Sequence, residues 1–223
     1  MFTPFDEDAG NDLALRGFLH SPSGPGGDSV VLTHGAGANC QSKLLVQISE
    51  ALAASGFAVL RFDLPFRRAR PHGPPPFGSA ERDRDGLRRA VAVMRPRTKG
   101  RIYLGGHSYG GRQSTMLLAD EPHLVDGLLL LSYPLHPPGK PGELRIKHFP
   151  KLTRPAFFVH GTQDPFGTIS EMKSALETIP APKALFEVHG AGHDLLRKGS
   201  DTDTLDRVAR AFAEFQHTIG SPG

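Results

Sequence analysis

Residues 103–111 read Tyr103-Leu104-Gly105-Gly106-His107-Ser108-Tyr109-Gly110-Gly111, and the rest of the chain is best understood from this point outward. A short apolar run, 102–104, leads into the pattern Gly-x-Ser-x-Gly, and a helix-compatible segment, 112–120, follows it. Strand, sharp turn and helix in this order are typical of a nucleophile elbow. The turn strains the backbone of the serine, so the residues two positions away must be glycine. We expect Ser108 to project above a sheet at a helix N-terminus, where the helix dipole favours negative charge.

The alternation of strand and helix continues through the chain. Apolar runs predict strands at 13–19, 30–33, 58–62, 128–131, 156–159 and 184–188, the first of which fits an antiparallel position. Apolar residues at helical spacing predict helices over 44–52, 87–94, 169–179 and 205–215. Ser42 is expected to cap the first helix, and Thr168 with Glu171 to form a capping box for the third. This alternation predicts one α/β domain over residues 1–223, a three-layer α/β/α sandwich with a mostly parallel, doubly wound sheet.

Two proline-rich segments, 64–78 and 132–155, interrupt this rhythm. Proline restricts φ and removes a backbone donor, so we expect loops there rather than helices or central strands. The first segment also carries Arg67, Arg68 and Arg70. Both segments should lie at the strand ends beside Ser108.

The composition is that of an ordinary soluble protein. The 223 residues are 38% hydrophobic and 22% charged, and the formal net charge of +3 gives no reason to expect a nucleic-acid partner. The single cysteine, Cys40, excludes an internal disulfide framework and fits a reducing compartment. Residues 1–8 are acidic and lack the features of a signal peptide, and no apolar run reaches the length of a membrane span. We therefore expect a cytoplasmic protein without a membrane partner.

Three polar residues follow predicted strand ends in the order serine, aspartate, histidine. Ser108 ends the elbow strand, Asp164 follows the strand at 156–159, and His193 follows the strand at 184–188. The carboxyl ends of parallel strands meet at one edge of a sheet, where ligands gather. A serine hydroxyl needs a base to take its proton, and the base needs a carboxylate to fix its tautomer. The order Ser…Asp…His is the one that accompanies a Gly-x-Ser-x-Gly elbow.

Each of these residues also has a plainer interpretation. Ser108 could be a structural turn serine, and Asp164 could cap its loop or the helix that follows. His189 lies nearer the strand than His193 does, but the flexible segment 190–192 favours His193. The two histidines are four residues apart, as in a helical metal pair, but the glycines between them argue against a helix, so we expect no metal.

The whole pattern resembles the alpha/beta-hydrolase superfamily over nearly the full length of the chain. Four stretches also resemble a small dienelactone-hydrolase-like branch, which includes eukaryotic relatives in a histone-acetyltransferase complex and a testis-expressed protein. These stretches are 61–65, 105–108, 133–139 and 164–167. The resemblance implies a triad of Ser108, Asp164 and His193, and an oxyanion hole made by the backbone N–H groups of Ala36 and Tyr109.

These features together predict a serine hydrolase that cleaves a small ester, thioester or related acyl bond through an acyl-enzyme. Arg67, Arg70, Tyr133 and His136 are candidate walls of the substrate site, and the arginines are a candidate subsite for an anionic substrate. Many superfamily members insert a helical cap after the strand at 128–131. The following segment lacks the apolar periodicity for such a cap, so we expect no substantial lid and a preference for short acyl esters.

Two other functions stay open. The chain could be a non-catalytic protein-interaction module that keeps the hydrolase fold, as the relation to a chromatin-complex subunit suggests. It could also be a small peptidase, because its Gly-x-Ser-Tyr-Gly-Gly motif also resembles prolyl-oligopeptidase-type enzymes. No phosphate-binding loop or dinucleotide fingerprint is present, so no cofactor is expected. A small-molecule acyl substrate is the expected partner, and the sequence does not determine the oligomeric state.

Overall fold

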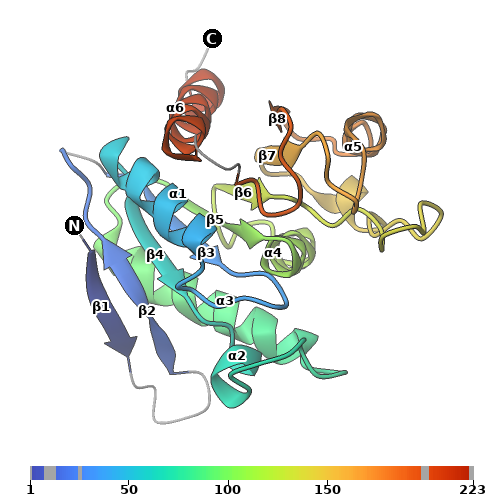
Figure 1. The fold of residues 1–223 in the computed structure, drawn as a ribbon. Helices are drawn as coiled ribbons and strands as arrows, with labels where there is room; N and C mark the ends of the chain where they lie inside the picture. The colour runs from blue at the N-terminus through green and yellow to red at the C-terminus, as the bar shows by residue number, and fades with distance from the viewer. Residues whose placement is uncertain (1, 8–13, 25–26, 197–200, 221–223) are drawn as a thin grey trace.

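The computed structural model describes residues 2–7, 14–24, 27–196 and 201–220. These residues form one eight-stranded sheet with the strand order β1-β2-β4-β3-β5-β6-β7-β8 (Figure 1). The strands are β1 (Phe2–Glu7), β2 (Leu15–His20), β3 (Ser29–Thr33), β4 (Ala58–Phe62), β5 (Ile102–His107), β6 (Gly127–Leu131), β7 (Ala156–Gly161) and β8 (Lys183–Val188). The ladders β1–β2 and β2–β4 are antiparallel and the other five are parallel, so the prediction of a mostly parallel sheet is confirmed.

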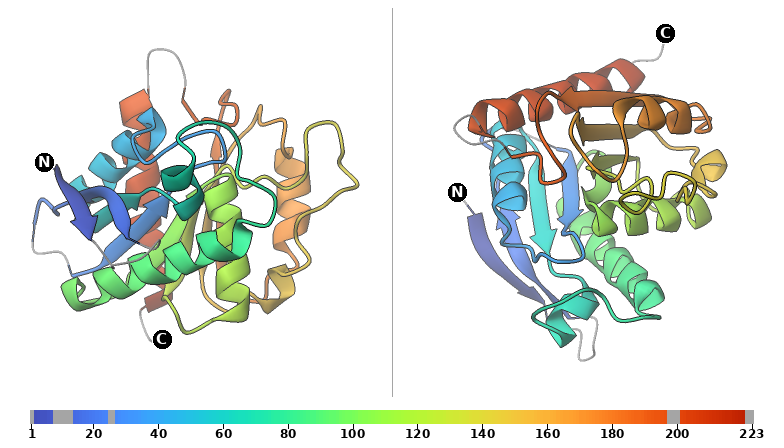
Figure 2. Two further views of the ribbon diagram at one scale, coloured as in Figure 1. Left: turned by 90° about the horizontal axis from the view of Figure 1, so that it is seen from below. Right: turned by 45° about the vertical axis from the view of Figure 1, so that its right-hand side comes forward.

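Helices cover both faces of this sheet and give the predicted three layers. They are α1 (Lys43–Ala54), α2 (Pro65–Ala69), α3 (Ala80–Met94), α4 (Tyr109–Asp120), α5 (Ile169–Leu176) and α6 (Asp201–Gly220), with 3-10 turns η1 (Arg95–Arg97) and η2 (Phe149–Lys151). Residues of α1 and α6 pack on one face, and residues of α3, α4 and α5 pack on the other (Figure 2).

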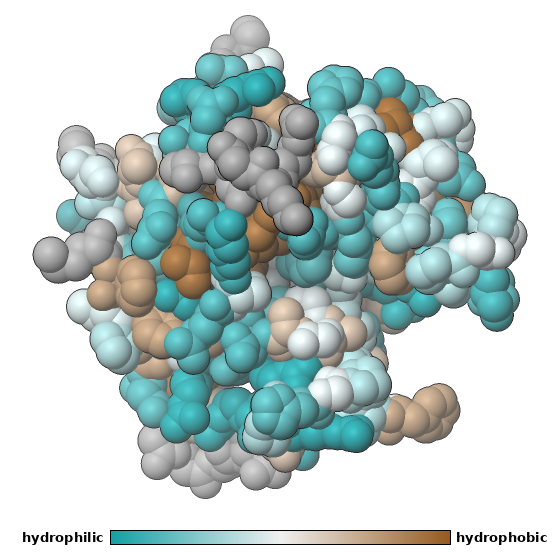
Figure 3. Space-filling view, viewed as in Figure 1, coloured by the Kyte–Doolittle hydropathy of each residue, from teal (hydrophilic) through white to brown (hydrophobic). Residues whose placement is uncertain are grey.

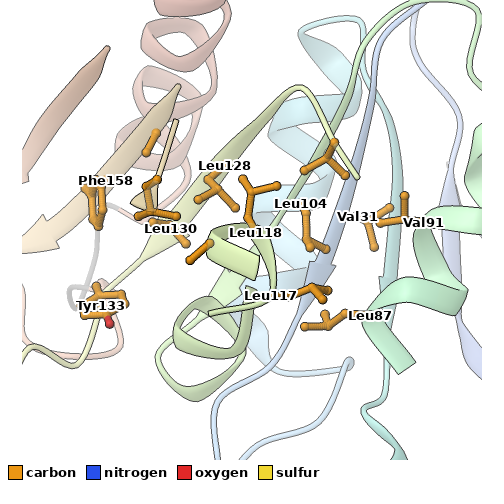
Figure 4. Packing of buried hydrophobic residues seen from close by; sticks show 14 of the residues in the cluster. Val31, Leu87, Val91, Leu104, Leu117, Leu118, Leu128, Leu130, Tyr133 and Phe158 are labelled. Atoms are coloured by element: carbon orange, nitrogen blue, oxygen red, sulfur yellow. The ribbon is translucent and has the colours of Figure 1, made fainter. Parts of the chain in front are cut away.

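A hydrophobic core lies on each face of the sheet, and successive side chains along a strand belong alternately to one core and the other. In β6, Leu128 and Leu130 belong to the core under α3 and α4, whereas Leu129 and Leu131 face α1 and α6. Figure 4 shows Leu128 and Leu130 beside Leu118 of α4. All four leucines of β6 are fully buried, which fits a strand in the middle of a parallel sheet with both faces covered.

The first strand of the sheet, β1, was not predicted. It pairs antiparallel with β2, which takes the place of the strand predicted at 13–19; residue 13 lies outside the described residues. The Arg61 guanidinium of β4 lies 4.7 Å from the ring centre of Phe2 and 4.1 Å from that of Phe18. A contact between side chains so far apart in sequence cannot be read from the local pattern of an acidic N-terminus.

The helix α2 contradicts the prediction that residues 64–78 contain no helix. Pro65 occupies its first turn, where no intrahelical N–H bond is needed and the fixed φ of proline suits the helix. The helix then ends at Ala69, before the next prolines. Proline therefore starts this short helix, although it would break a helix at an interior position.

The capping box of α5 is confirmed. The Glu171 N–H donates to the Thr168 hydroxyl at 3.2 Å, and the Thr168 N–H donates to the Glu171 carboxylate at 2.8 Å. The helix α1 begins directly after Ser42 as predicted, but the Ser42 side chain makes no capping hydrogen bond.

The connection between β6 and β7 contains no helix apart from the single turn η2, so no cap domain is built there. Across the described part of the chain, no helix combines the length and the apolar character needed to cross a membrane. On the face drawn in Figure 3, hydrophilic side chains prevail and apolar ones form small separate areas.

Candidate active site

The nucleophile elbow has the conformation that its sequence predicts. Ser108 joins β5 to α4 with φ 50° and ψ −112°, a region that a non-glycine residue enters only under strain. A Cβ on Gly106 would lie 2.4 Å from the Thr33 carbonyl oxygen, and one on Gly110 would lie 2.7 Å from the His34 carbonyl oxygen. Both glycines are therefore required by the close approach of the elbow to the end of β3.

Ser108, His193 and Asp164 form a continuous hydrogen-bonded chain. His193 Nε2 lies 2.8 Å from Ser108 Oγ, and His193 Nδ1 lies 2.8 Å from Asp164 Oδ2 and 3.0 Å from Oδ1. The carboxylate can only accept, so Nδ1 carries the proton and the Nε2 lone pair accepts from the Ser108 hydroxyl. The Asp164 side chain is fully buried while the His193 side chain is 22% exposed, so solvent can reach the imidazole but not the carboxylate.

The Asp164 loop is held by its own neighbours. The Phe166 N–H donates to Asp164 Oδ1 at 2.9 Å, and the Phe166 ring centre lies 4.2 Å from that of His193. His160 lies behind the carboxylate and donates from Nε2 to the Gly167 carbonyl at 2.8 Å. Burial lowers the pKa of His160, which favours a neutral ring beside Asp164, so that no second cation competes with His193 for this carboxylate.

His34 orients the peptide that carries the Ala36 N–H. His34 Nδ1 donates to the Gly35 carbonyl at 2.8 Å, and His34 Nε2 accepts from the Leu64 N–H at 3.1 Å. These two bonds fix one neutral tautomer, and burial lowers the pKa of His34, which favours the neutral ring. The Gly35 carbonyl and the Ala36 N–H belong to the same planar peptide, so His34 fixes the direction of that N–H. A Cβ on Gly35 would lie 3.4 Å from Ser108 Cβ, which places this loop against the serine.

Arg67 binds the next part of the same loop. Its guanidinium donates to the carbonyls of Ala36 at 2.8 Å and Ala38 at 2.7 Å, and to those of Arg70 at 3.0 Å and Gly73 at 2.9 Å. The residue is only 5% exposed. Its donors are thus engaged by the backbone of two loops, and the prediction that Arg67 forms a subsite for an anionic substrate is wrong.

Tyr109, the residue after the serine, ties α4 to α3. Its hydroxyl donates to Asp83 Oδ2 at 2.7 Å, and Asp83 Oδ1 accepts from the Phe66 N–H at 3.0 Å. Burial raises the pKa of Asp83, although these hydrogen bonds favour its charged form. The Tyr109 N–H belongs to the first turn of α4, where no intrahelical acceptor exists, so it is available to an oxyanion.

This geometry agrees with the comparisons with known proteins. A family model described as an alpha/beta hydrolase domain matches residues 27–220. The chain belongs to the alpha/beta-hydrolase family. This family match supports a hydrolase.

Solved structures of other alpha/beta hydrolases share its fold. A dienelactone hydrolase from Anabaena variabilis has a TM-score of 0.75 at 22% identity, covering 96% of this chain and 97% of its own. Est1E from Butyrivibrio proteoclasticus has a TM-score of 0.74 at 16% identity, covering 96% and 99%. An alpha/beta serine hydrolase without lid from Xanthomonas campestris has a TM-score of 0.68 at 16% identity, covering 99% and 97%.

Two further residues predicted to line the substrate site of this alpha/beta hydrolase are buried instead. Tyr133 has no exposed surface and lies in the core near Leu130 and Phe158 (Figure 4), where its hydroxyl donates to the Arg145 carbonyl at 2.6 Å. His136 is 5% exposed, and its Nδ1 donates to the Pro137 carbonyl at 2.7 Å. These predictions failed because a residue after a strand end can turn inward, and the sequence does not show the direction.

Arg70 is the exposed member of the predicted set. Its carbonyl accepts from Arg67, and its side chain lies beside Gly73. Its place in the substrate site stays a prediction.

One residue of the alpha/beta-hydrolase site was not singled out from the sequence. His107 Nε2 donates to the His193 carbonyl at 2.8 Å, and a Cβ on Gly35 would lie 2.9 Å from His107 Nδ1. Burial lowers the pKa of His107 to about 4, so the ring is neutral at neutral pH. His107 therefore lies between the His193 loop and the Gly35 loop. The only feature of the sequence that could have indicated its place in the site is its position between Gly106 and Ser108 in the elbow.

Proposed function

We propose that this chain is a serine hydrolase that cleaves a small ester, thioester or related acyl bond through a covalent acyl-enzyme. The observation that carries the proposal is the hydrogen-bonded chain from Ser108 through His193 to the buried Asp164, at the end of a strained elbow. A serine hydroxyl with a correctly oriented base and a buried carboxylate behind it is the arrangement that nucleophilic acyl transfer requires.

In the first step, Ser108 Oγ attacks the acyl carbon while His193 Nε2 takes the hydroxyl proton. Asp164 stabilises the imidazolium that forms and holds its tautomer. His193 then gives the proton to the leaving oxygen or sulfur, and the acyl group stays on Ser108. A water molecule, deprotonated by the same histidine, attacks the acyl-enzyme and releases the acid.

The negative charge that develops on the carbonyl oxygen needs donors fixed in advance. We assign this role to the N–H groups of Ala36 and Tyr109. His34 and Arg67 hold the peptides of the first loop, and the hydrogen bond to Asp83 holds the Tyr109 side chain. Donors that do not reorganise during the reaction are the most effective in stabilising an oxyanion.

Small soluble esters are the substrates we expect. The connection from β6 to β7 builds no cap that would enclose a long acyl chain. Among the proteins that share the fold, one is named a dienelactone hydrolase, and Est1E has a structure with ferulic acid bound. We further propose a cytoplasmic location, since a chain with the single cysteine Cys40 forms no internal disulfide and fits a reducing compartment.

Labelling with a fluorophosphonate tests the proposal. The wild-type protein should form a covalent adduct at Ser108 and hydrolyse para-nitrophenyl acetate. Ser108→Ala should abolish the adduct and lower turnover by about 10⁶-fold, with an unchanged circular dichroism spectrum. Folded wild-type protein that neither reacts with the probe nor hydrolyses short esters would refute the proposal and favour a non-catalytic interaction module.

A further inference from the structure

A basic groove lies between α4 and the segment 144–151. It has a volume of about 500 Å³ and is lined by four cationic side chains, Arg112, Arg145, Lys147 and Lys151. Its apolar lining comes from Met116 and Leu144, the latter 43% exposed. We refer to these six residues as the basic groove.

Among the described residues, the four cations of the basic groove have no carboxylate partner. Within the described parts of the chain, no Asp or Glu oxygen lies within ion-pair distance of any of them, although Arg84, Arg88 and Arg89 of the neighbouring α3 are all paired. Arg112 Nε is buried and has no hydrogen-bond partner. An anion that enters the groove would pair with these cations through charge-assisted hydrogen bonds, which are stronger than neutral ones.

The charges in the basic groove also repel one another. Burial and then the Arg112 charge lower the pKa of Arg145. The same two causes lower the pKa of His148 to about 4, so this histidine is neutral at neutral pH and does not add to the charge; its Nε2 lies 2.8 Å from the Thr115 hydroxyl. Asp120 raises the pKa of His148 and Glu143 raises that of Arg145, but both effects are smaller than that of Arg112, and Glu143 is paired with Lys140. An anion between the guanidinium groups would relieve this repulsion.

The basic groove lies close to the elbow. Arg112 is one helical turn beyond Ser108, and its N–H donates to the Ser108 carbonyl at 2.9 Å. On the other wall, the Arg145 N–H donates to the Leu135 carbonyl at 2.8 Å, in the chain that leaves β6. The groove thus begins at the same edge of the sheet as the candidate active site and runs along α4.

We propose that the basic groove binds the phosphate group of a small molecule that also carries an apolar part. Two guanidinium groups with two ammonium groups around one cavity match the charge and the several acceptor oxygens of a phosphate. The volume is that of a site for a small ligand, and the side chains of Met116 and Leu144 suit an apolar substituent. This proposal is independent of hydrolysis at Ser108, because it concerns binding alone.

Isothermal titration calorimetry at low salt tests the proposal. Inorganic phosphate should bind the wild-type protein, n-hexyl phosphate should bind more tightly, and 1-hexanol should not bind. Affinity for both phosphates should fall as sodium chloride is raised, because ionic contacts are screened. No heat of binding with either phosphate at millimolar concentration would overturn the proposal, as would equal binding of the neutral alcohol.

Matched variants locate the site. Arg112→Met and Arg145→Met keep the aliphatic bulk and should each weaken hexyl phosphate binding about tenfold or more, because each removes a charge-assisted hydrogen bond. Lys99→Met removes the same charge from an exposed position at the opposite end of the sheet and should leave the affinity unchanged. Lys147 is exposed, so Lys147→Glu should fold normally and should weaken hexyl phosphate binding by reversing one charge of the groove. This variant tests the site even if an arginine variant does not fold. Wild-type affinity in Lys147→Glu, or equal weakening by Lys99→Met, would show non-specific attraction and overturn the assignment.

Discussion

Arg67→Met should damage turnover rather than substrate binding. Arg67 makes four hydrogen bonds, and two of them hold the carbonyls of Ala36 and Ala38 in the loop beside Ser108. Complete loss of one oxyanion donor costs about 10²–10³ in kcat. His34 still holds the Gly35 carbonyl in this variant, so we expect a smaller loss, about 10- to 100-fold, with little change in KM.

The stability of the same variant follows from the same contacts. Hydrogen bonds from charged groups contribute about 1.5–3 kcal/mol each, but the methionine also removes the cost of burying a guanidinium. We therefore expect a net loss of about 2–4 kcal/mol in the free energy of unfolding, measured by urea denaturation.

The assay compares kcat and KM for para-nitrophenyl acetate and for a carboxylated ester, with Arg70→Met as the control. Arg70 is exposed and in the same segment, and its side-chain charge is removed in the same way, so this control should retain wild-type kcat. A kcat within twofold of wild type in Arg67→Met would refute the reasoning. So would a rise in KM confined to the carboxylated ester and abolished by salt, because that result would mean that Arg67 binds substrate.

Three further predictions concern the carboxylate that orients His193, the stability of the fold at low pH and the packing of the core. Asp164→Asn should lower ester turnover by about 10⁴-fold in a folded protein, because the amide stabilises the wrong tautomer of the base; an Asn variant with wild-type turnover would place the acid elsewhere. Burial lowers the pKa of His107 from 6.5 to about 4, so between these pH values the unfolded chain binds more protons than the folded chain. The free energy of unfolding should therefore decrease as the pH is lowered from 6.5 to 4, by up to about 1.4 kcal/mol per pH unit. His20 and His148 are shifted in the same direction, and His107→Gln should flatten the slope measured by denaturation at pH 6.5 and 4.5; an unchanged slope would contradict the shift. Leu130→Ala should lower the free energy of unfolding in urea by about 2–5 kcal/mol, and a loss below 1 kcal/mol would mean that the core closes over the cavity.

The elements around the elbow could be predicted because their signals are local. The apolar run before Gly106, the glycines and the capping box at Thr168 each act within a few residues, and the structure has all of them. The meeting of Ser108 with two distant polar residues was also predictable, because parallel strands bring their carboxyl ends to one edge.

Arg67 shows what could not be predicted. The sequence presents it within a proline-rich, arginine-rich segment, which is typical of a solvated loop. Its burial depends on four carbonyl oxygens, two of which lie about thirty positions earlier in the chain. Tyr133 failed for a related reason, since its ring turns into the core under β6 and β7. Contacts of this kind are set by the path of the loops in three dimensions, for which local periodicity carries no information.

The position of β8 at the border of the sheet has a consequence for how the protein loses activity. This strand pairs only with β7 among the described strands, and five of its six residues are partly exposed, whereas β5 is almost entirely buried. Amide hydrogens in such a border strand exchange through local opening at a lower free energy than those of central strands. His193 lies on the loop that leaves β8, so the proposed base is attached to a weakly protected border strand and the proposed nucleophile to a well-protected central strand. Mild denaturant should therefore separate the two groups, and abolish turnover, before the central strands unfold.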